Sequence, residues 1–304
     1  MAKTLVVLGG PTAVGKTRCG IAVAKHLQTE IVSADSRQIY RETSIGTAVP
    51  SPEELSAVRH HFIQTVSLKE NYNASRYEQE VLDLLEDLFK HHDQVLLVGG
   101  SGLYIHAVCE GIDELPSPDP VLRAELLRRV EHGGLESLTE ELRRVDPVSH
   151  ERIDLRNPMR VTKALEVSLQ TGKPYSDHLS EKPKQRPFNI LRIALNMERE
   201  RLYQRINKRV DRMMEKGLLE EVERLQHFRG CNALKSVGYR ELLDHLDGKT
   251  SLEEAVDLIK RNTRKFARRQ LTWFRKDELY QWFSPDEPGE LIRWIEEKLN
   301  LQDR

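Results

Sequence analysis

Residues 10–17 read Gly-Pro-Thr-Ala-Val-Gly-Lys-Thr, and this stretch constrains the fold more than any other part of the chain. It follows the apolar run 5–8 and leads into a helix-like segment at 18–27. Glycines let backbone N–H groups turn toward anionic oxygens, the lysine adds a positive charge, and the last hydroxyl can ligate Mg²⁺. The sequence therefore predicts a phosphate-binding loop between a strand and a helix, without naming the molecule that carries the phosphate. The residues expected to contact it are Gly10, Pro11, Thr12, Ala13, Val14, Gly15, Lys16 and Thr17, with Thr17 as the Mg²⁺ ligand.

Short apolar runs recur along the chain and are mostly separated by helix-like stretches. They lie at 5–8, 31–33, 62–66, 95–98 and 190–195. This spacing predicts an α/β fold with a parallel sheet flanked by helices. Ligands of such sheets bind at the carboxyl ends of the strands, where the phosphate loop, Asp35 and the glycine-rich stretch 99–102 all fall. We therefore expect these three segments to line one crevice.

The pattern changes after residue 115. Prolines punctuate the chain at 116, 118 and 120, and the stretch that follows, 121–178, is charged, helix-like and nearly without strand character. Strand-like residues return only near 188. We predict a helical insertion domain at 116–186, within an α/β core formed by 1–115 and 187–304.

Two long helices are predicted in the last third of the chain. Apolar residues at steps of three and four predict an amphipathic helix over 198–226. Ser251 with Glu254 has the spacing of a capping box, which predicts that a second helix opens there and runs to residue 275.

Composition narrows the kind of protein. The 304 residues carry 47 Lys and Arg against 48 Asp and Glu, so the net charge of −1 offers no general attraction for nucleic acid. Cys19, Cys109 and Cys231 are widely spaced, which argues against a disulfide framework or a zinc site, and the adjacent histidines at 60–61 and 91–92 would point apart. No signal sequence or run of membrane-span length occurs, so we expect a cytoplasmic protein without membrane contact.

Asp35 follows the second predicted strand and faces the expected crevice. Its carboxylate could hold Mg²⁺ through water, could accept a proton from a substrate, or could cap the next helix. The residues alone leave these alternatives open. A nucleotide-hydrolysing enzyme would place a metal-binding Asp at the end of a hydrophobic strand, but the run 95–98 continues into Gly-Gly-Ser without an acid. This argues against an ordinary ATPase or GTPase.

The turn after the run 95–98 allows two interpretations. Its glycines would let a ligand approach the backbone closely beside Ser101. The same residues also suit a tight turn that leads into a helix.

Basic residues gather in three clusters. Residues 261–276 carry seven cations and no acid, with aromatic residues between them, which favours contact with a nucleic-acid backbone over a solvated helix face. Arg160 and Lys163 share one face of a helix predicted within 156–167. The third cluster could cap a phosphate from the side opposite Lys16. It comprises Arg199, Arg201, Arg205, Lys208 and Arg209.

Seven blocks of sequence, in this order and spread over nearly the whole chain, resemble the bacterial tRNA dimethylallyltransferase family. They are Gly-Pro-Thr-Ala-Val-Gly-Lys-Thr (10–17), Asp-Ser-Arg-Gln-Ile-Tyr (35–40), Ile-Gly-Thr-Ala (45–48), Val-Gly-Gly-Ser-Gly-Leu-Tyr (98–104), Asn-Pro-Met-Arg-Val-Thr-Lys-Ala-Leu-Glu-Val (157–167), Ser-Val-Gly-Tyr-Arg (236–240) and Arg-Arg-Gln-Leu-Thr-Trp-Phe-Arg (268–275). The family often has Thr where this chain has Ser101, and residues 121–150 carry no motif that aligns.

The resemblance implies a P-loop NTPase-like core with a helical insertion that grips the anticodon stem of tRNA. It implies transfer of a dimethylallyl group from dimethylallyl diphosphate to the exocyclic N6 amine of the adenosine 3′ to the anticodon, with release of diphosphate. Mg²⁺ is the implied cofactor, and we expect a monomer.

The resemblance also implies roles for individual residues. Asp35 is the expected general base, and Thr12, Lys16 and Arg205 are expected to stabilise the departing diphosphate. The remaining implied residues would contact tRNA, and Gln38 and Ser101 among them would hold the target base. They are Asp35, Ser36, Arg37, Gln38, Ser101, Arg123, Met159, Arg160, Val161, Thr162, Lys163, Arg240, Arg264, Arg268 and Arg269.

Three other functions are compatible with parts of this pattern. An adenylate isopentenyltransferase would modify free AMP, ADP or ATP by the same chemistry. A P-loop kinase of a small metabolite would use Asp35 as base and ATP as donor, and a non-catalytic protein could simply bind RNA. The helical insertion and the acid-free basic stretch favour an RNA acceptor, because a free nucleotide requires neither.

Overall fold

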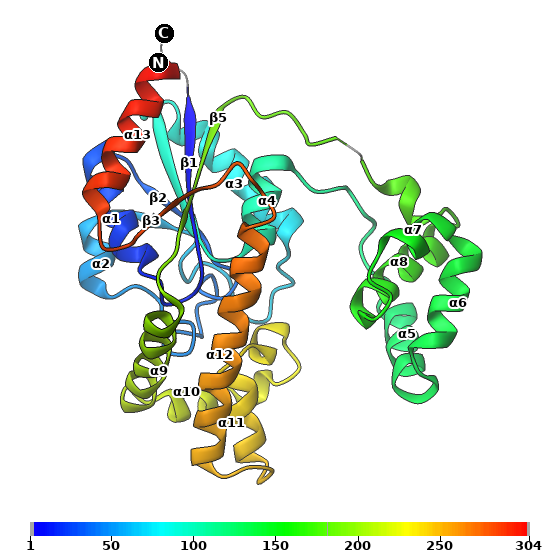
Figure 1. The fold of residues 1–304 in the computed structure, drawn as a ribbon. Coiled ribbons are helices and arrows are strands. Elements are labelled where there is room, and N and C mark those ends of the chain that lie inside the picture. The colour runs from blue at the N-terminus through cyan, green and yellow to red at the C-terminus, as the bar shows by residue number, and fades with distance from the viewer. Residues whose placement is uncertain (1–2, 181, 303–304) are drawn as a thin grey trace. The chain divides into compact units, whose positions relative to one another are not determined.

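A computed structural model describes residues 3–180 and 182–302, and a parallel sheet lies at its centre (Figure 1). The strand order is β3-β2-β4-β1-β5-β6, with every neighbouring pair parallel. The strands are β1 (Thr4–Gly9), β2 (Ile31–Ala34), β3 (His60–His61), β4 (Gln94–Gly99), β5 (Asn189–Leu195) and β6 (Gln281–Phe283). The predicted α/β class with a parallel sheet is confirmed.

Helices cover both faces of the sheet (Figure 1). On one face α1 (Lys16–Leu27) packs beside α13 (Pro288–Gln302), and on the other α3 (Ala74–Leu88) packs against α4 (Gly102–Glu110). The central strands are apolar throughout because both of their faces are buried. Tyr77 of α3 ties the second layer to the sheet, since its hydroxyl donates to the Ser33 carbonyl at 2.8 Å and its ring stacks on Tyr104.

Two strand predictions need correction. The strand expected at 62–66 is wrong: β3 is His60–His61, and the chain then turns through left-handed backbone at Phe62 (φ 61°) and Gln64 (φ 52°). Only an isolated bridge between Tyr40 and Val66 continues the pairing. The short strand β6 was not predicted, because three residues give too little alternation to recognise.

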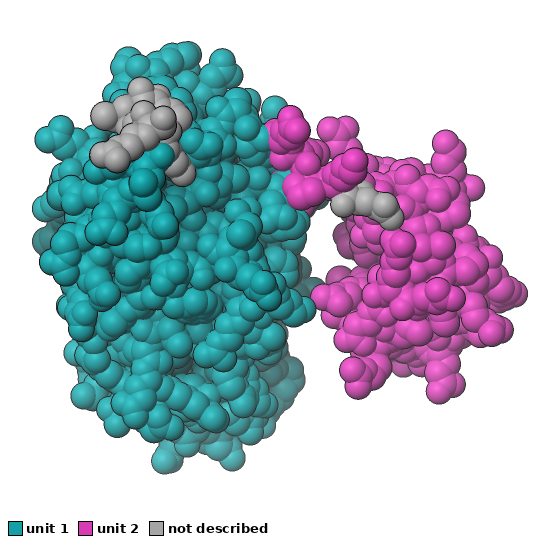
Figure 2. Space-filling view, turned by 45° about the horizontal axis from the view of Figure 1, so that its top comes forward, with its two compact units in different colours: residues 1–110, 186–304 teal, residues 111–185 magenta. Residues whose placement is uncertain are grey.

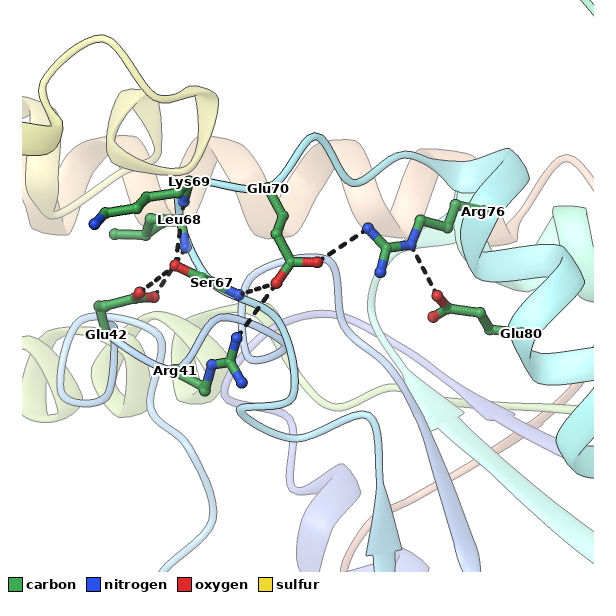
Figure 3. Close-up of polar contacts among 8 residues, drawn as sticks. All are labelled: Arg41, Glu42, Ser67, Leu68, Lys69, Glu70, Arg76 and Glu80. Atoms are coloured by element: carbon green, nitrogen blue, oxygen red, sulfur yellow. Dashed lines mark hydrogen bonds and ion pairs between the residues drawn. The ribbon is translucent and has the colours of Figure 1, made fainter.

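A surface network of charged side chains holds the loops beside β3 (Figure 3). Glu70 accepts hydrogen bonds from the Ser67 backbone, from Arg41 and from Arg76. Glu42 accepts from the Ser67 hydroxyl at 2.6 Å. These contacts tie the segment after Asp35 to the loop that precedes α3.

The later part of the core is helical. Helix α9 (Arg199–Glu215) ends before Gly217 (φ 90°), and α10 (Leu218–Arg224) begins after it, so the predicted unbroken helix over 198–226 is wrong. The second prediction is confirmed: Ser251 and Glu254 form a capping box at the start of α12 (Leu252–Phe274). The other elements of the core are α2 (Pro52–Ala57), α11 (Tyr239–Leu246) and the 3₁₀ turns Gln226–Phe228 and Asn232–Lys235.

The chain forms two compact units (Figure 2). One contains 1–110 and 186–304, and the other contains 111–185. The sequence placed these boundaries at 115/116 and 186/187. The second unit starts earlier because its proline-rich leading segment is bound by its own later residues: Asp113 accepts from the Ser180 backbone at 2.7 Å, and Gln170 donates to the Ser117 carbonyl at 2.9 Å.

The second unit is a helical bundle with its own core. Its elements are α5 (Pro120–Gly133), α6 (Leu135–Val145), α7 (Pro147–Arg152), α8 (Pro158–Thr171) and the 3₁₀ turn Tyr175–His178. Leu126, Leu138 and Leu142 pack against Val161 and Leu165, and all five side chains are fully buried. In the described part of the chain, no helix is both long and apolar enough to cross a membrane.

Candidate active site

A large open cavity of about 1710 Å³ lies in the first unit, at the carboxyl ends of the strands. Its wall includes the phosphate loop, residues 35–38 and residues 99–104. Helices α9 and α12 supply the remaining sides. The prediction that three separate segments meet in one crevice is therefore confirmed.

The phosphate loop curls around the ammonium of Lys16. Its Nζ donates to the carbonyl oxygens of Gly10 at 3.0 Å and Pro11 at 2.8 Å. Burial lowers the pKa of Lys16 to about 8, and Asp35 opposes this shift while Arg209 adds to it. Lys16 is thus a cation that the free protein stabilises poorly, as expected where an anionic ligand is to complete its environment.

Two arginines of α9 reach the phosphate loop. A Cβ built on Gly15 would lie 3.5 Å from Nη2 of Arg205, and Arg209 donates from Nη1 to the Thr12 hydroxyl at 3.4 Å. Burial lowers the pKa of both guanidinium groups. The sequence singled out Arg205 for this position, whereas Arg209 was only one member of the basic cluster. Their spacing of four residues places both on one face of the helix.

Asp35 combines two of the roles that its sequence left open. Oδ1 accepts from the backbone N–H of Arg37 at 2.9 Å and of Gln38 at 3.3 Å, so the carboxylate stabilises the turn that follows β2. The same carboxylate lies close enough to Lys16 and Arg209 to affect the pKa of each. It therefore lies in the cavity beside the loop, within a local structure that it helps to hold.

The side chains expected to hold a base are themselves held by the cavity wall. Ser101 Oγ accepts from the Ser36 N–H at 2.9 Å and donates to Ser36 Oγ at 3.1 Å. Gln38 Nε2 donates to the carbonyls of Thr47 and Ala48. These bonds join the end of β4 and the 44–48 loop to the turn after Asp35.

Gln270 of α12 is a site residue that the sequence analysis missed. Its Oε1 accepts from the Thr12 N–H at 2.8 Å, and its Nε2 donates to the Gly100 carbonyl at 2.9 Å. It thereby connects α12 to the phosphate loop and to the turn after β4. Its helical position was the available signal: it lies between buried Ala267 and Phe274 on the inward stripe, where a polar side chain needs a partner.

A buried carboxylate explains two further blocks of the sequence. Glu221 accepts from the backbone N–H groups of Ser44, Ile45 and Gly46, and from the Tyr239 hydroxyl at 2.6 Å. A Cβ on Gly46 would lie 2.6 Å from the Tyr239 ring, so only glycine allows this approach. The motifs at 45–48 and 236–240 thus form one contact.

The residues expected to contact tRNA from the core are mostly at the surface. Arg268 and Arg269 are exposed on α12, while Arg264 donates to Asn207 at 2.7 Å. Arg240 is half-exposed and bonds Glu241, and Arg37 donates to the Asn232 carbonyl at 3.3 Å. Their guanidinium groups remain accessible to varying degrees.

The second unit divides its predicted contacts between surface and core. Met159 and Arg160 are exposed, but Val161 and Thr162 are fully buried. Side chains buried in a helical core cannot reach RNA while α8 stays folded, so the prediction is wrong for Val161 and Thr162.

Two other cations of this unit lie beside one carboxylate. Arg123 Nε is 3.6 Å from Oε1 of Glu166, which is fully buried, and Glu166 raises the pKa of half-buried Lys163 while burial lowers it more. Neither oxygen of Glu166 has a hydrogen-bond partner among the described residues. Arg123 and Lys163 therefore compensate a buried charge as well as facing solvent in part.

The site suits Mg²⁺ held mainly by a ligand. Thr17 lies in the first turn of α1 and lines the cavity, where its hydroxyl can supply one oxygen. Among the residues that the structure describes, no three His, Cys, Asp or Glu side chains are grouped to hold a metal. Mg²⁺ commonly takes one or two protein oxygens and completes its shell with phosphate oxygens and water, and these residues fit that mode.

Comparisons with known proteins agree with this geometry. The sequence model of one family, described as IPP transferase, matches residues 38–277. Curated relatives named tRNA dimethylallyltransferase include one from Phocaeicola vulgatus, 48% identical over 97% of this chain and 98% of the relative, and one from Cytophaga hutchinsonii, 48% identical over 98% of each.

Solved structures show the same relationship. The tRNA isopentenylpyrophosphate transferase of Bacillus halodurans has a TM-score of 0.73 at 36% identity, over 99% of this chain and 100% of that one. A eukaryotic dimethylallyltransferase acting on tRNA has a TM-score of 0.71 at 25% identity, over 90% and 70%. Because the family match spans most of the chain and the relatives align over nearly their full length, this chain belongs to the IPP transferase family.

Proposed function

We propose that this protein transfers a dimethylallyl group from dimethylallyl diphosphate to the exocyclic N6 amine of the adenosine 3′ to the anticodon of a tRNA, releasing diphosphate. One observation carries the proposal: the phosphate loop, Asp35 and two arginines of α9 line a single cavity bordered by the basic helix α12. A diphosphate at the loop places its first carbon on the side where Asp35 lies. The family relationship supports the same donor and acceptor.

Asp35 is the proposed general base. An adenine amine is a poor nucleophile because its lone pair is delocalised into the ring, so its proton must leave as the carbon–nitrogen bond forms. The carboxylate of Asp35 accepts that proton, and its bonds to the Arg37 and Gln38 N–H groups hold it in place. The carbon–oxygen bond of the donor breaks, and the electron pair leaves with the diphosphate.

The phosphate loop stabilises the charge that develops on the departing diphosphate. Lys16, Arg205 and Arg209 supply positive charge, and Thr12 supplies a hydroxyl. Mg²⁺, when bound between Thr17 and the diphosphate, adds electrostatic stabilisation of the leaving group. These groups need no hydrolytic water, which agrees with the absence of an acid after β4.

The RNA is bound by the exposed cations and by the second unit. The target base must leave the stack of the anticodon loop to reach Asp35, as enzymes that modify bases require. Arg268 and Arg269 of α12, together with Arg160 and Lys163 of α8, contact backbone phosphates. The second unit grips the anticodon stem, and the protein acts on tRNA in the cytoplasm as a monomer.

Incubation with labelled dimethylallyl diphosphate and either tRNA or AMP tests the proposal. We expect label in tRNA, and nucleoside analysis should find it on N6 of the adenosine beside the anticodon. Label in AMP alone would identify an adenylate isopentenyltransferase instead. Phosphoryl transfer from ATP to a small molecule, with no label in either acceptor, would identify a kinase.

A further inference from the structure

Two large aromatic side chains of α12 remain exposed on the wall of the cavity. Phe266 is 39% exposed and Trp273 is 43% exposed, and both line the cavity. Most large apolar side chains of the core are buried, so two exposed aromatic rings at one site call for an explanation. They are separated by seven residues, which is two helical turns and about 10 Å on one helix face.

The positions of both rings are fixed relative to the phosphate loop. Gln270 lies between them and bonds the Thr12 N–H and the Gly100 carbonyl, so α12 cannot shift along its axis without breaking these bonds. A Cβ on Gly102 would lie 2.3 Å from Cδ1 and Nε1 of Trp273, which shows that the indole rests directly on the glycine backbone. The remaining surface of each ring faces the cavity, a preformed apolar surface at a fixed distance from the expected diphosphate.

Cations surround the two rings. The guanidinium of Arg269 lies 5.8 Å from the centroid of Phe266, and Lys265 and Arg269 also line the cavity. Aromatic rings interleaved with cations are how proteins bind single-stranded nucleic acid, because every base offers a flat face to stack and a phosphate to neutralise. A five-carbon prenyl group would need one small apolar pocket and no surrounding cations.

We infer that Phe266 and Trp273 are stacking surfaces for the unpaired bases that flank the target adenosine. The inference rests on the proposed function and deepens it, since it assigns a specificity role to two residues outside the catalytic groups. Extrusion of the target base leaves its neighbours without a stacking partner. The two rings replace that partner and so favour a substrate whose target lies in a single-stranded loop.

The test compares Phe266→Ala and Trp273→Ala with the unaltered protein, using an anticodon stem-loop RNA and dimethylallyl diphosphate. Each variant should raise the Kd for RNA about tenfold or more, by the same factor at every salt concentration, because stacking releases no counterions. The KM for dimethylallyl diphosphate should not change. Trp273→Phe should restore most of the affinity, which a lost structural contact of the indole alone would not explain.

The matched control is Leu252→Ala, which removes an apolar side chain of similar exposure from the same helix, away from the cavity. It should leave the RNA affinity unchanged. In a protein with Trp282→Phe and Trp294→Phe, the emission of Trp273 should be quenched when RNA binds.

Unchanged RNA affinity in both alanine variants would overturn the inference. A raised KM for dimethylallyl diphosphate with an unchanged Kd for RNA would also overturn it and would assign the rings to the prenyl group. Label transfer to tRNA by the unaltered protein, measured in parallel, distinguishes either result from failure of the proposed function.

Discussion

At the residue scale, Lys16 makes the binding of diphosphate depend on pH. Burial holds its pKa at about 8, below the usual 10.5, so the ammonium begins to lose its proton above pH 8 in the free protein. A bound diphosphate raises that pKa, because its negative charge favours the protonated form. Binding should therefore take up a proton above pH 8, and the affinity should fall by up to about tenfold per pH unit there.

Calorimetry of dimethylallyl diphosphate binding in two buffers of different ionisation enthalpy measures this uptake. We expect almost none at pH 7, where Lys16 is charged with or without ligand, and an approach to one proton near pH 9. Lys16→Arg should show no uptake, since arginine keeps its charge. Equal proton uptake at pH 7 and 9 in the unaltered protein would contradict the assignment.

The same pKa has a consequence for stability. Between about pH 8 and 10.5 the unfolded chain binds more protons at Lys16 than the folded chain does. The contribution of Lys16 to the free energy of unfolding therefore rises with pH across this window and is constant below it.

Asp35 can be tested without disturbing the turn that it stabilises. Asp35→Asn keeps an oxygen that accepts from the Arg37 and Gln38 N–H groups but cannot accept the amine proton. We expect turnover to fall by a factor of about 10²–10⁴, with the Kd for tRNA nearly unchanged. Turnover within about tenfold of the unaltered protein, roughly 1.4 kcal/mol, would show that Asp35 is not the base.

At the element scale, α12 carries two kinds of RNA contact that respond differently to salt. Arg268→Ala with Arg269→Ala should weaken tRNA binding and flatten the plot of log affinity against log salt by roughly one unit, because fewer counterions are released. Binding titrations at several salt concentrations measure the slope. A variant that loses affinity but keeps the full slope would exclude phosphate contact by these arginines.

The same helix shows how far local sequence patterns reach. The capping box at Ser251 and the apolar stripe predict where α12 begins and which face is buried, because both depend on residues within a few positions of one another. Gln270 was missed because its two partners belong to the loops after β1 and β4, and no local pattern records them. The break at Gly217 was missed because the apolar spacing continues across it.

At the scale of the whole molecule, the second unit should be separable from the first. Arg186 donates to the carbonyls of Ala107 and Val108 and pairs with Glu78, so the points where the chain leaves and re-enters the core lie together. Replacement of 112–184 by a short Gly-Ser linker should leave a folded core that binds dimethylallyl diphosphate within about threefold of normal. Its tRNA affinity should fall more than tenfold, since the cations of α8 are lost.

Thermal melting, calorimetry and RNA titration check the shortened protein. Full tRNA affinity in a folded variant would show that the second unit does not bind RNA. A matched deletion that also carries Arg186→Ala should melt at a lower temperature, because the clamp at the junction is then absent.

The sequence by itself determined the phosphate loop, the α/β class and the helical insertion, because each follows from spacing within a short segment. Tertiary structure alone decided that Gln270 binds the Thr12 N–H across 258 residues, that Arg209 bonds Thr12, and that Tyr239 rests on Gly46. Such contacts depend on where whole elements pack, and periodicity along the chain carries no record of that. The same reason explains Val161 and Thr162: their motif predicted a binding surface, and packing placed them in a core.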